Sequence, residues 1–308
     1  MDRLTCVLGN PEAVAVAHPL GVIRYNAAEP SVRRGTAGLD VPLASAVAEV
    51  WTADRPVTAT SGDGLSVGHD GGYAFCAGVV PPADRYAPGV RAAYLRAFGA
   101  LADLGYPFVF RMWNFIGGIN ASNADGLEIY RDFCRGRAEA FERSPLPSRM
   151  LPAATGVGAH SPGIVFFLLA RREPGHRVVE NHRQVPAYHY PERYGPRAPS
   201  FARATCLPGG PLLISGTASI LGHRTVHAGD VTAQCRTTLA NLAALAPDLA
   251  ALRAVKVYLR HAADAATVRA VCAPVFGGGA AYFTTDLCRS DLLVEIEGMA
   301  PTLVPVAA

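Results

Sequence analysis

The chain has 308 residues, of which half are hydrophobic and 17% are charged, and this is enough apolar material for a large core or two packed domains. Its net charge of +3 comes almost entirely from arginine, since Lys256 is the only lysine, and no basic stripe follows a predicted helix. A nucleic-acid partner is therefore excluded. The longest hydrophobic run, residues 164–170, is too short to cross a bilayer, and no run of signal-peptide length follows Met1. We expect a cytoplasmic protein that does not interact with membranes.

The first seventy residues are rich in Ala, Gly, Pro and Val and predict extra strands attached to the elements that follow. Apolar periodicity then predicts a strand, a helix, a strand, a helix and two strands, at residues 74–80, 90–104, 108–115, 127–142, 153–157 and 164–170. The same order returns at residues 212–217, 231–245, 255–260, 263–271, 282–288 and 292–297.

This repetition predicts an α+β fold, a duplicated βαβαββ unit in which each mixed sheet carries its helices on one face. We expect residues 1–175 to form the N-terminal half with its extra strands, and residues 176–308 to form the C-terminal half. The bare sheet faces then pack together or against another subunit, which leaves a monomer and a homotrimer open.

The spacing of cysteines and histidines indicates neither a disulfide framework nor a metal site. Seven cysteines form no Cys-x-x-Cys pair, and they stand at positions 6, 76, 134, 206, 235, 272 and 288. His223 and His227 are four residues apart, as on one face of a helix, but Gly222 and Gly229 flank them and Asp230 indicates a helix start after them. We expect a turn at these histidines, and no metal or other cofactor.

One long segment resists assignment to a helix or strand. Residues 177–203 contain four prolines and combine guanidinium groups with aromatic rings, from Arg183, Arg193, Arg197, Arg203, Tyr188, Tyr190, Tyr194, His182 and His189. Arginine binds carboxylates bidentately, and tyrosine offers a flat face with a polar tip. The segment is typical of a pocket wall for a small, flat, anionic molecule, and the alternative is a basic surface loop.

The last predicted hairpin contains a candidate general acid. Glu295 and Glu297 share one strand face, opposite Val294 and Ile296, because side chains alternate along a strand. A carboxyl among apolar neighbours stays protonated near neutrality, which is the state that a general acid requires. The alternative is that both glutamates are solvated edge residues. Cys288, on the preceding strand, either reaches the same cavity or belongs to the core.

Other candidate groups are less specific. Tyr130 and Arg137 are two helical turns apart and so share one face, as in any amphipathic helix. The run at residues 277–279 is either a flexible connection or a set of backbone N–H groups that close on a carboxylate. The chain has no glycine-rich nucleotide loop, no Gly-x-Ser-x-Gly and no His-Glu-x-x-His, so nucleotide binding, serine hydrolysis and zinc hydrolysis are not expected.

Seven motifs between residues 73 and 298 together resemble the chorismatase family. In chain order they are FRMWNFI (110–116) with GIN (118–120), YRDFCRGR (130–137), PAATGVG (152–158), QVPAYHYP (184–191), SFARAT (200–205), ISGTASI (214–220) and CRSDLLVE (288–295). The resemblance implies a fold related to the RidA-type (YjgF-like) deaminases and to chorismate mutase of the same shape. It also implies an enzyme that removes the enolpyruvyl group of chorismate as pyruvate.

The resemblance also implies roles for individual residues. Glu295 would protonate the enol-ether methylene, and chorismate would be held by Tyr130, Arg137, Tyr190, Arg203 and the backbone near Gly278. Apart from the resemblance, Glu297 is the alternative acid if a Glu295→Gln variant keeps full activity. One branch of the family admits water and forms a dihydroxy-cyclohexadiene carboxylate, whereas the other excludes water and forms 3-hydroxybenzoate. Cys288, seven residues before the acid, and Gly216, where the hydrolysing branch has alanine, are similar to the second branch, so we expect 3-hydroxybenzoate.

Three alternatives remain open at this point. The first is hydrolysis of chorismate to the diene, and the second is isomerisation to prephenate. The third is a non-catalytic binder of aromatic acids, because the connection at residues 245–252 and the region after Thr205 look shorter than those of the family.

Overall fold

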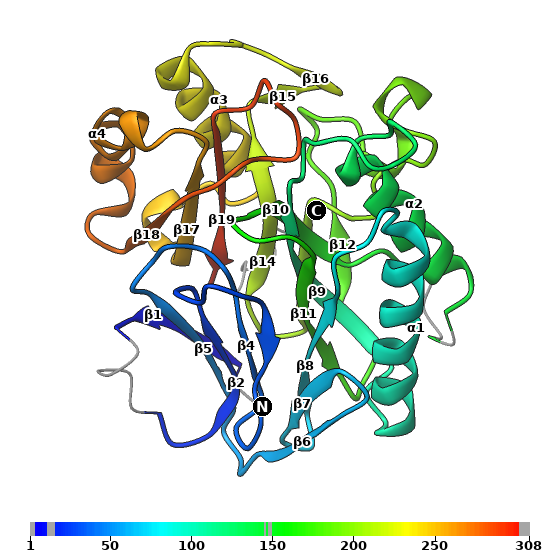
Figure 1. Cartoon of the computed structure of the whole chain (residues 1–308). Coiled ribbons are helices and arrows are strands. Elements are labelled where there is room, and N and C mark those ends of the chain that lie inside the picture. The colour runs from blue at the N-terminus through cyan, green and yellow to red at the C-terminus, as the bar shows by residue number, and fades with distance from the viewer. Residues whose placement is uncertain (1–3, 11–15, 145, 147–149, 302–308) are drawn as a thin grey trace.

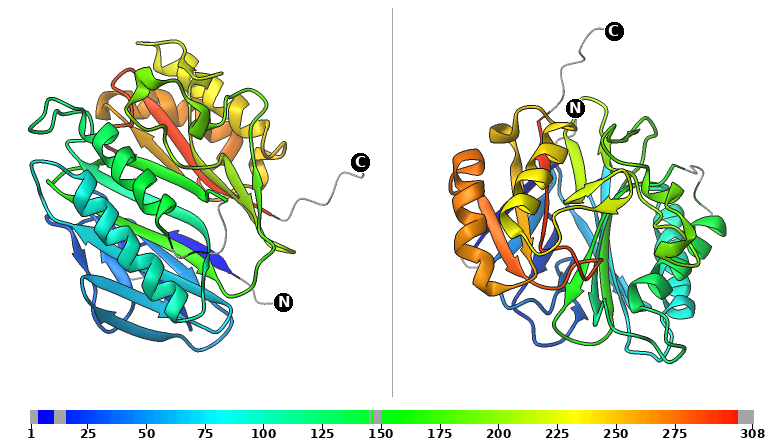
Figure 2. Two further views of the ribbon diagram at one scale, coloured as in Figure 1. Left: turned by 90° about the vertical axis from the view of Figure 1, so that its right-hand side faces the viewer. Right: turned by 90° about the horizontal axis from the view of Figure 1, so that it is seen from above.

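Two six-stranded mixed sheets face each other in the computed structural model, and each carries two helices on its outer side (Figure 1; Figure 2, right). The structure describes residues 4–10, 16–144, 146 and 150–301. Within these residues, no helix is both long and apolar enough to span a bilayer.

The first sheet has the order β10-β9-β11-β8-β7-β6 and is covered by α1 and α2. Its elements are β6 (Thr58–Gly62), β7 (Leu65–His69), β8 (Tyr73–Val80), α1 (Ala87–Asp103), β9 (Phe108–Gly117), α2 (Ile129–Glu142), β10 (Ala153–Ala159) and β11 (Ile164–Arg171). From β8 onward this is the predicted βαβαββ order, which is confirmed.

The second sheet has the order β12-β13-β14-β19-β17-β18 and is covered by α3 and α4. Its elements are β12 (Arg177–Val179), β13 (Ala204–Cys206), β14 (Leu212–Ala218), α3 (Val231–Ala243), β17 (Arg253–Leu259), α4 (Ala265–Phe276), β18 (Ala280–Thr284) and β19 (Val294–Ala300). Short 3-10 turns lie at η1 (Ala187–His189), η2 (Glu192–Tyr194), η3 (Leu249–Ala251) and η4 (Ala262–Asp264), and a small ribbon pairs β15 (Ile220–Leu221) with β16 (Arg224–Thr225).

The last two strands, β18 and β19, do not form the predicted hairpin. β17 lies between β18 and β19, because it pairs in parallel with β18 and in antiparallel fashion with β19. A parallel pair needs a crossover, and α4 supplies it. The strand predicted to end at Cys288 therefore ends at Thr284, and the chain then crosses the end of β17 as a loop in which Leu287 bridges to Val157 of the first sheet.

The N-terminal segment forms a sheet of its own, drawn in blue in Figure 1, with the order β1-β5-β2-β4-β3. Its strands are β1 (Thr5–Gly9), β2 (Pro19–Arg24), β3 (Ser31–Val32), β4 (Gly38–Asp40) and β5 (Ala48–Thr52). Trp51 of this sheet and Tyr25, which directly follows β2, pack into one apolar cluster with Phe167 of the first large sheet and Tyr258 of the second. The faces that the helices leave bare are thus buried against each other and against a third sheet within one chain.

Strand alternation explains how each large sheet serves two cores. On β11, Phe166 and Leu168 pack under α1 and α2, whereas Val165 and Phe167 point into the central cluster. On β19, Val294 and Ile296 pack under α3 and α4 in the same way. The other face of β19 points toward the first sheet.

Candidate active site

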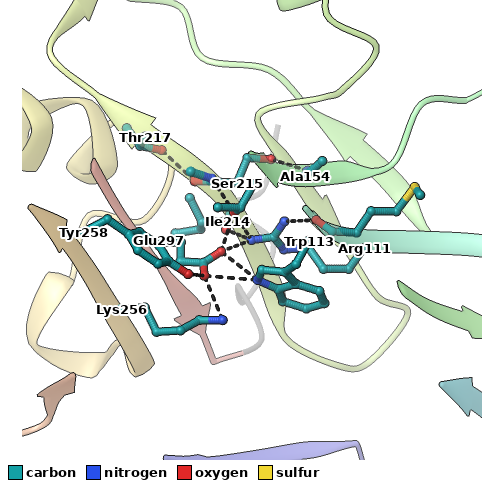
Figure 3. A network of polar contacts seen from close by, with 12 residues as sticks. Arg111, Trp113, Ala154, Ile214, Ser215, Thr217, Lys256, Tyr258 and Glu297 are labelled. Atoms are coloured by element: carbon teal, nitrogen blue, oxygen red, sulfur yellow. Dashed lines mark hydrogen bonds and ion pairs between the residues drawn. The ribbon is translucent and has the colours of Figure 1, made fainter. Parts of the chain in front are cut away.

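The two large sheets meet where the edge strand β10 lies against β14. The N–H of Ala154 donates to Oγ of Ser215 over 2.9 Å, a contact drawn in Figure 3, and the N–H of Gly216 donates to Oγ1 of Thr155 over 3.0 Å. These bonds join β10 to β14 by side chains, without a continuous ladder. The seam therefore brings side chains of both halves into one place.

A cavity of about 220 Å³ lies at this seam, and a second cavity of about 40 Å³ shares part of its lining. Both are lined by Tyr130, Pro199, Phe201, Gly216, Cys288 and Glu295. Tyr190 and Arg203 line the larger cavity, and Arg137 lines the smaller one. The fold thus brings together seven of the eight residues that the sequence predicted for the site, from α2, β14, β19 and three loops.

Glu295 lies on β19, where it pairs with Ala218 on one side and Tyr258 on the other, and it is 3% exposed. Burial, together with the negative charge of Glu297, raises the pKa of Glu295 to about 8. Arg111 and Arg203 oppose this shift without reversing it. The carboxyl is therefore protonated at neutral pH, as expected of a general acid, and the alternative of a solvated edge residue is wrong.

Gly216 allows the Glu295 carboxyl to lie where it does. A Cβ atom at position 216 would stand 1.9 Å from Oε1 of Glu295 and 3.3 Å from Cγ2 of Thr155. Real Cβ contacts are never as short as the first distance, so any larger residue would displace the carboxyl. The glycine is required for close approach of the acid.

Glu297, two residues further along the same face, lies in a dry network of donors (Figure 3). Its carboxylate accepts hydrogen bonds from Trp113 Nε1 (2.9 Å) and Tyr258 OH (2.7 Å) and pairs with Lys256 Nζ over 2.8 Å. Arg111 and Thr155 also donate to it. Burial alone would raise the pKa of Glu297, but Lys256 and Arg111 lower it to about 2, so Glu297 is a fixed anion rather than the alternative acid.

The two predicted arginines are held by neutral oxygens. Arg203 donates to Tyr190 OH over 2.7 Å and to the carbonyl of Val185 over 3.0 Å, while its Nε is buried without a partner. Arg137 donates twice to the carbonyl of Ser200, from Nε at 3.2 Å and Nη2 at 3.1 Å. None of these contacts is an ion pair, so both guanidiniums can bind an anionic ligand, and the Glu180 carboxyl is a further charged neighbour of Arg203.

Tyr130 and Cys288 form the side of the cavity beside Glu295. Burial raises the pKa of the Tyr130 hydroxyl, and burial together with Glu295 raises that of the Cys288 thiol. Both groups are therefore neutral. Cys288 lies in the loop after β18 rather than on a strand, but this loop still brings it to the cavity, as the sequence predicted.

Only part of the 177–203 segment lines the cavity. The residues that do are Tyr190, Tyr194, Pro199, Phe201 and Arg203. Arg183 instead donates to Oδ1 of Asn241 on α3 over 2.8 Å, and Arg197 pairs with Glu142 of α2. Those two arginines fasten the segment to helices of both halves, so the pocket wall is narrower than its composition suggests.

Gly278 is the one predicted site residue that the fold does not bring to either of the two described cavities. Gly278 lines neither cavity, and it lies just before β18, at the end of the sheet where Ala280 pairs with Val255. Glu295 pairs with Tyr258 toward the other end of β17, on the far side of that strand from β18. The sequence of residues 277–279 does not fix their position relative to Glu295, so this distance could not be predicted from the sequence.

Sequence reasoning missed Arg289 as a cavity residue. Its guanidinium lies 4.1 Å from the ring centroid of Tyr194 and donates to the carbonyl of His223 over 3.0 Å. Arg131 also lines the cavity, beside Glu128 at 3.3 Å. Both arginines could have been predicted from their positions in the sequence, because Arg289 directly follows Cys288 and Arg131 directly follows Tyr130.

The two spaced histidines lie in turns, as predicted. His223 is in the turn between β15 and β16, and His227 has a positive φ of 59°. The side chain of Asp230 then caps α3 by accepting from the N–H of Ala233 over 2.9 Å. Across the part of the chain that the structure describes, no three His, Cys, Asp or Glu side chains are grouped to hold a metal ion.

Comparison with known proteins agrees with this geometry. The family model described as chorismatase FkbO/Hyg5-like, N-terminal, matches residues 49–170. A 3-hydroxybenzoate synthase from Streptomyces hygroscopicus is 50% identical over 91% of this chain and 91% of its own length. This chain belongs to the chorismatase family. Another relative, a chorismatase from Streptomyces rapamycinicus, is 44% identical over 82% of this chain and 81% of its own.

The fold of the family is shared as well. A chorismatase crystal structure superposes with a TM-score of 0.90 at 40% identity, covering 96% of this chain and 98% of that chain. The resemblance predicted from the seven motifs is thus confirmed. In this member of the chorismatase family, the seam places a neutral carboxyl, two arginines and aromatic rings around two cavities that share part of their lining.

Proposed function

We propose that this chain converts chorismate into 3-hydroxybenzoate and pyruvate, with Glu295 as the general acid. The observation that carries the proposal is the protonated Glu295 carboxyl, which borders both the cavity lined by Arg203 and the smaller cavity lined by Arg137. The relative with 50% identity is a 3-hydroxybenzoate synthase, which supports the same product.

Glu295 begins the reaction. Transfer of its proton to the methylene carbon of the enolpyruvyl group leaves an oxocarbenium ion, whose positive charge then faces the carboxylate that Glu295 has become. Chorismate in its ground state carries no such charge. The interaction is therefore strongest as the transition state forms, and this is what lowers the barrier.

The arginines orient the substrate for this transfer. Chorismate carries one carboxylate on its ring and one on its enolpyruvyl group, and two separated guanidiniums, Arg137 and Arg203, suit a molecule with two anionic ends. The unpartnered Nε of Arg203 is a donor that a ligand carboxylate can satisfy. Tyr130 and Tyr190 supply flat surfaces for the ring.

Exclusion of water decides the product. When the oxygen of the substrate's own ring hydroxyl, in place of water, bonds to the neighbouring ring carbon that carries the enolpyruvyl oxygen, the bond between that carbon and the enolpyruvyl oxygen breaks and pyruvate leaves. The hydroxyl proton returns to the Glu295 carboxylate, so the acid is restored. The new three-membered ring then opens at its other carbon, the hydrogen on the carbon that keeps the oxygen leaves as a proton, and a proton returns to the phenol oxygen, so the ring becomes aromatic and the two products contain all the atoms of chorismate. The neutral Cys288 thiol and Gly216 line the cavity beside the acid, where a water molecule would otherwise approach.

Incubation of the purified protein with chorismate, followed by chromatography, tests the proposal. We expect equal amounts of 3-hydroxybenzoate and pyruvate, one deuterium in the pyruvate methyl when the solvent is deuterated, and no solvent oxygen in 3-hydroxybenzoate in heavy-oxygen water. The non-aromatic diene would indicate the hydrolysing reaction, prephenate an isomerase, and binding without pyruvate release a non-catalytic binder. Each of these three results would contradict the proposal.

A further inference from the structure

The single lysine of the chain lies between two carboxylates. Lys256, on β17, is 2% exposed, and its Nζ is 2.8 Å from Oε1 of Glu297 and 2.7 Å from Oε2 of Glu49. Glu297 is its register partner on β19, whereas Glu49 comes from β5 of the N-terminal sheet. Burying three charges costs free energy unless each charge is paired, so a buried cluster of this kind indicates a role beyond packing.

The charges of the network balance. Arg111 and Lys256 supply two positive charges, and Glu49 and Glu297 supply two negative ones. The remaining titratable neighbours, Cys6, Tyr25 and Tyr258, are neutral because burial, with Glu49 or Glu297 nearby, raises their pKa values. Ionisation of Glu295 would add an uncompensated negative charge beside this set.

The N-terminal sheet anchors the network. Glu49 accepts from Trp51 Nε1 over 2.7 Å and from the Tyr25 hydroxyl, so two donors of the N-terminal segment hold its carboxylate in addition to Lys256. The two carboxylates raise the pKa of Lys256 above its ordinary value although burial alone would lower it, so the ammonium stays charged. Lys256 lines neither of the cavities around Glu295.

We propose that Lys256 and Glu49 are positioning residues for the acid: they hold Glu297 as a fixed anion, and this charge keeps the proton of the carboxyl pair on Glu295. The inference rests on the proposed function only in its kinetic test. It assigns the N-terminal sheet a part in the chemistry, because Glu49 is the residue through which that sheet acts.

The protonation of Glu295 depends on every charged or titratable group that faces it. Besides Glu297 and Arg111 from the network, these are the charged or titratable residues that line the two cavities: Glu128, Tyr130, Arg131, Cys134, Arg137, Tyr190, Tyr194, Arg203, Cys288, Arg289 and Asp291. None of these eleven contacts Lys256 or Glu49 through a hydrogen bond or ion pair that the structure records. Variants at Lys256 and Glu49 therefore change the network without changing the cavity lining.

Lys256→Met tests the proposal, because methionine keeps the apolar stem and removes the charge. We expect kcat at neutral pH to fall about tenfold, as for a shift of one pKa unit, with KM within about threefold of wild type. Without Lys256 the two glutamates share one proton. Lowering the pH protonates both, so activity is expected to recover toward acid, whereas a loss of the same size at every pH would contradict the proposal.

Glu49→Gln in the Lys256→Met background supplies the matched control. It removes the second anion and returns the network to neutrality, so we expect kcat at neutral pH to rise about threefold or more above the Lys256→Met variant. A purely structural role predicts that the double variant is worse than either single one. Such an additive loss would overturn the inference.

Two further measurements keep the test decisive. If Lys256→Met does not fold, Glu49→Gln alone is the test. It leaves a surplus positive charge that favours ionised Glu295, so the activity must decline at a lower pH than in wild type. A pH profile that does not move would refute the inference.

Infrared spectra of the carboxylic-acid band need no turnover. We expect Glu295→Gln to remove this band in the otherwise wild-type chain. In Lys256→Met we expect part of the band intensity to arise from Glu297. If the whole band still arises from Glu295 in Lys256→Met, the proposal is contradicted even if chorismate is not the substrate.

Discussion

The cavity around Glu295 and the network around Glu297 lie on the same face of β19, and each holds a buried glutamate, 3% and 1% exposed. At Glu295, Arg111 and Arg203 offset the effect of burial only in part and the pKa rises to about 8, whereas Lys256 and Arg111 overcome the burial of Glu297 and lower its pKa to about 2. Burial is common to both. The difference therefore shows that the nearest charges, rather than depth, decide which glutamate holds a proton.

Glu295→Gln should produce the largest effect on catalysis. Glutamine has nearly the same shape but no transferable proton, so we expect kcat with chorismate to fall by roughly 10²–10⁴-fold. Pyruvate release measures the rate, and Glu173→Gln, at an exposed position, is the control that should keep full activity. Full activity in Glu295→Gln would show that Glu295 is not the general acid.

Glu297→Gln should damage stability instead. It leaves Lys256 and Arg111 buried with one anion between them, and breaking a buried ion pair in this way costs about 3–5 kcal/mol of unfolding free energy. Urea denaturation of both glutamine variants measures the contrast. Equal stability of Glu295→Gln and Glu297→Gln would show that the two regions do not differ as described.

Gly216→Ala should weaken the acid without removing it. The new methyl group takes the space of Oε1 of Glu295, so the carboxyl must turn away, and we expect about a tenfold loss of kcat together with a larger share of the diene product. Chromatography gives both values. Gly99→Ala, on α1, is the control, because a Cβ atom at this position would meet no neighbouring atom within 4 Å outside the helix backbone. An unchanged product ratio in Gly216→Ala would show that Gly216 does not help to exclude water.

The pH dependence should differ in sign between the two regions. Activity needs protonated Glu295, so kcat is expected to fall as the pH rises through about 8. The raised pKa of Glu295 means that its contribution to stability is complete below the ordinary value of 4.5 and is lost as the pH rises through about 8, at up to about 1.4 kcal/mol per pH unit.

The depressed pKa of Glu297 gives the opposite trend, because its contribution is complete above 4.5 and is lost as the pH falls toward about 2. Unfolding free energies of the wild type and of both glutamine variants across this range test the assignment. Each variant should lose one of the two slopes, and loss of the same slope in both would contradict it.

Local chemistry made much of this protein predictable. Strand alternation placed Glu295 and Glu297 on one face, helical spacing placed Tyr130 and Arg137 together, and periodicity located both βαβαββ units. The motifs then identified the family. All of these signals act between residues close in the sequence, and their physical basis is the fixed geometry of helices and strands.

Only the tertiary structure decided which glutamate is neutral and which glycine matters. The proton on Glu295 depends on Arg111 from β9 and on the charge of Glu297, and Glu297 is paired with Lys256 from β17, which also pairs with Glu49 from β5, 207 residues away in the chain. Electrostatic interactions depend on distance in space and on exclusion of water, and neither can be obtained from spacing along a chain. Packing of the two sheets against the N-terminal sheet created both conditions.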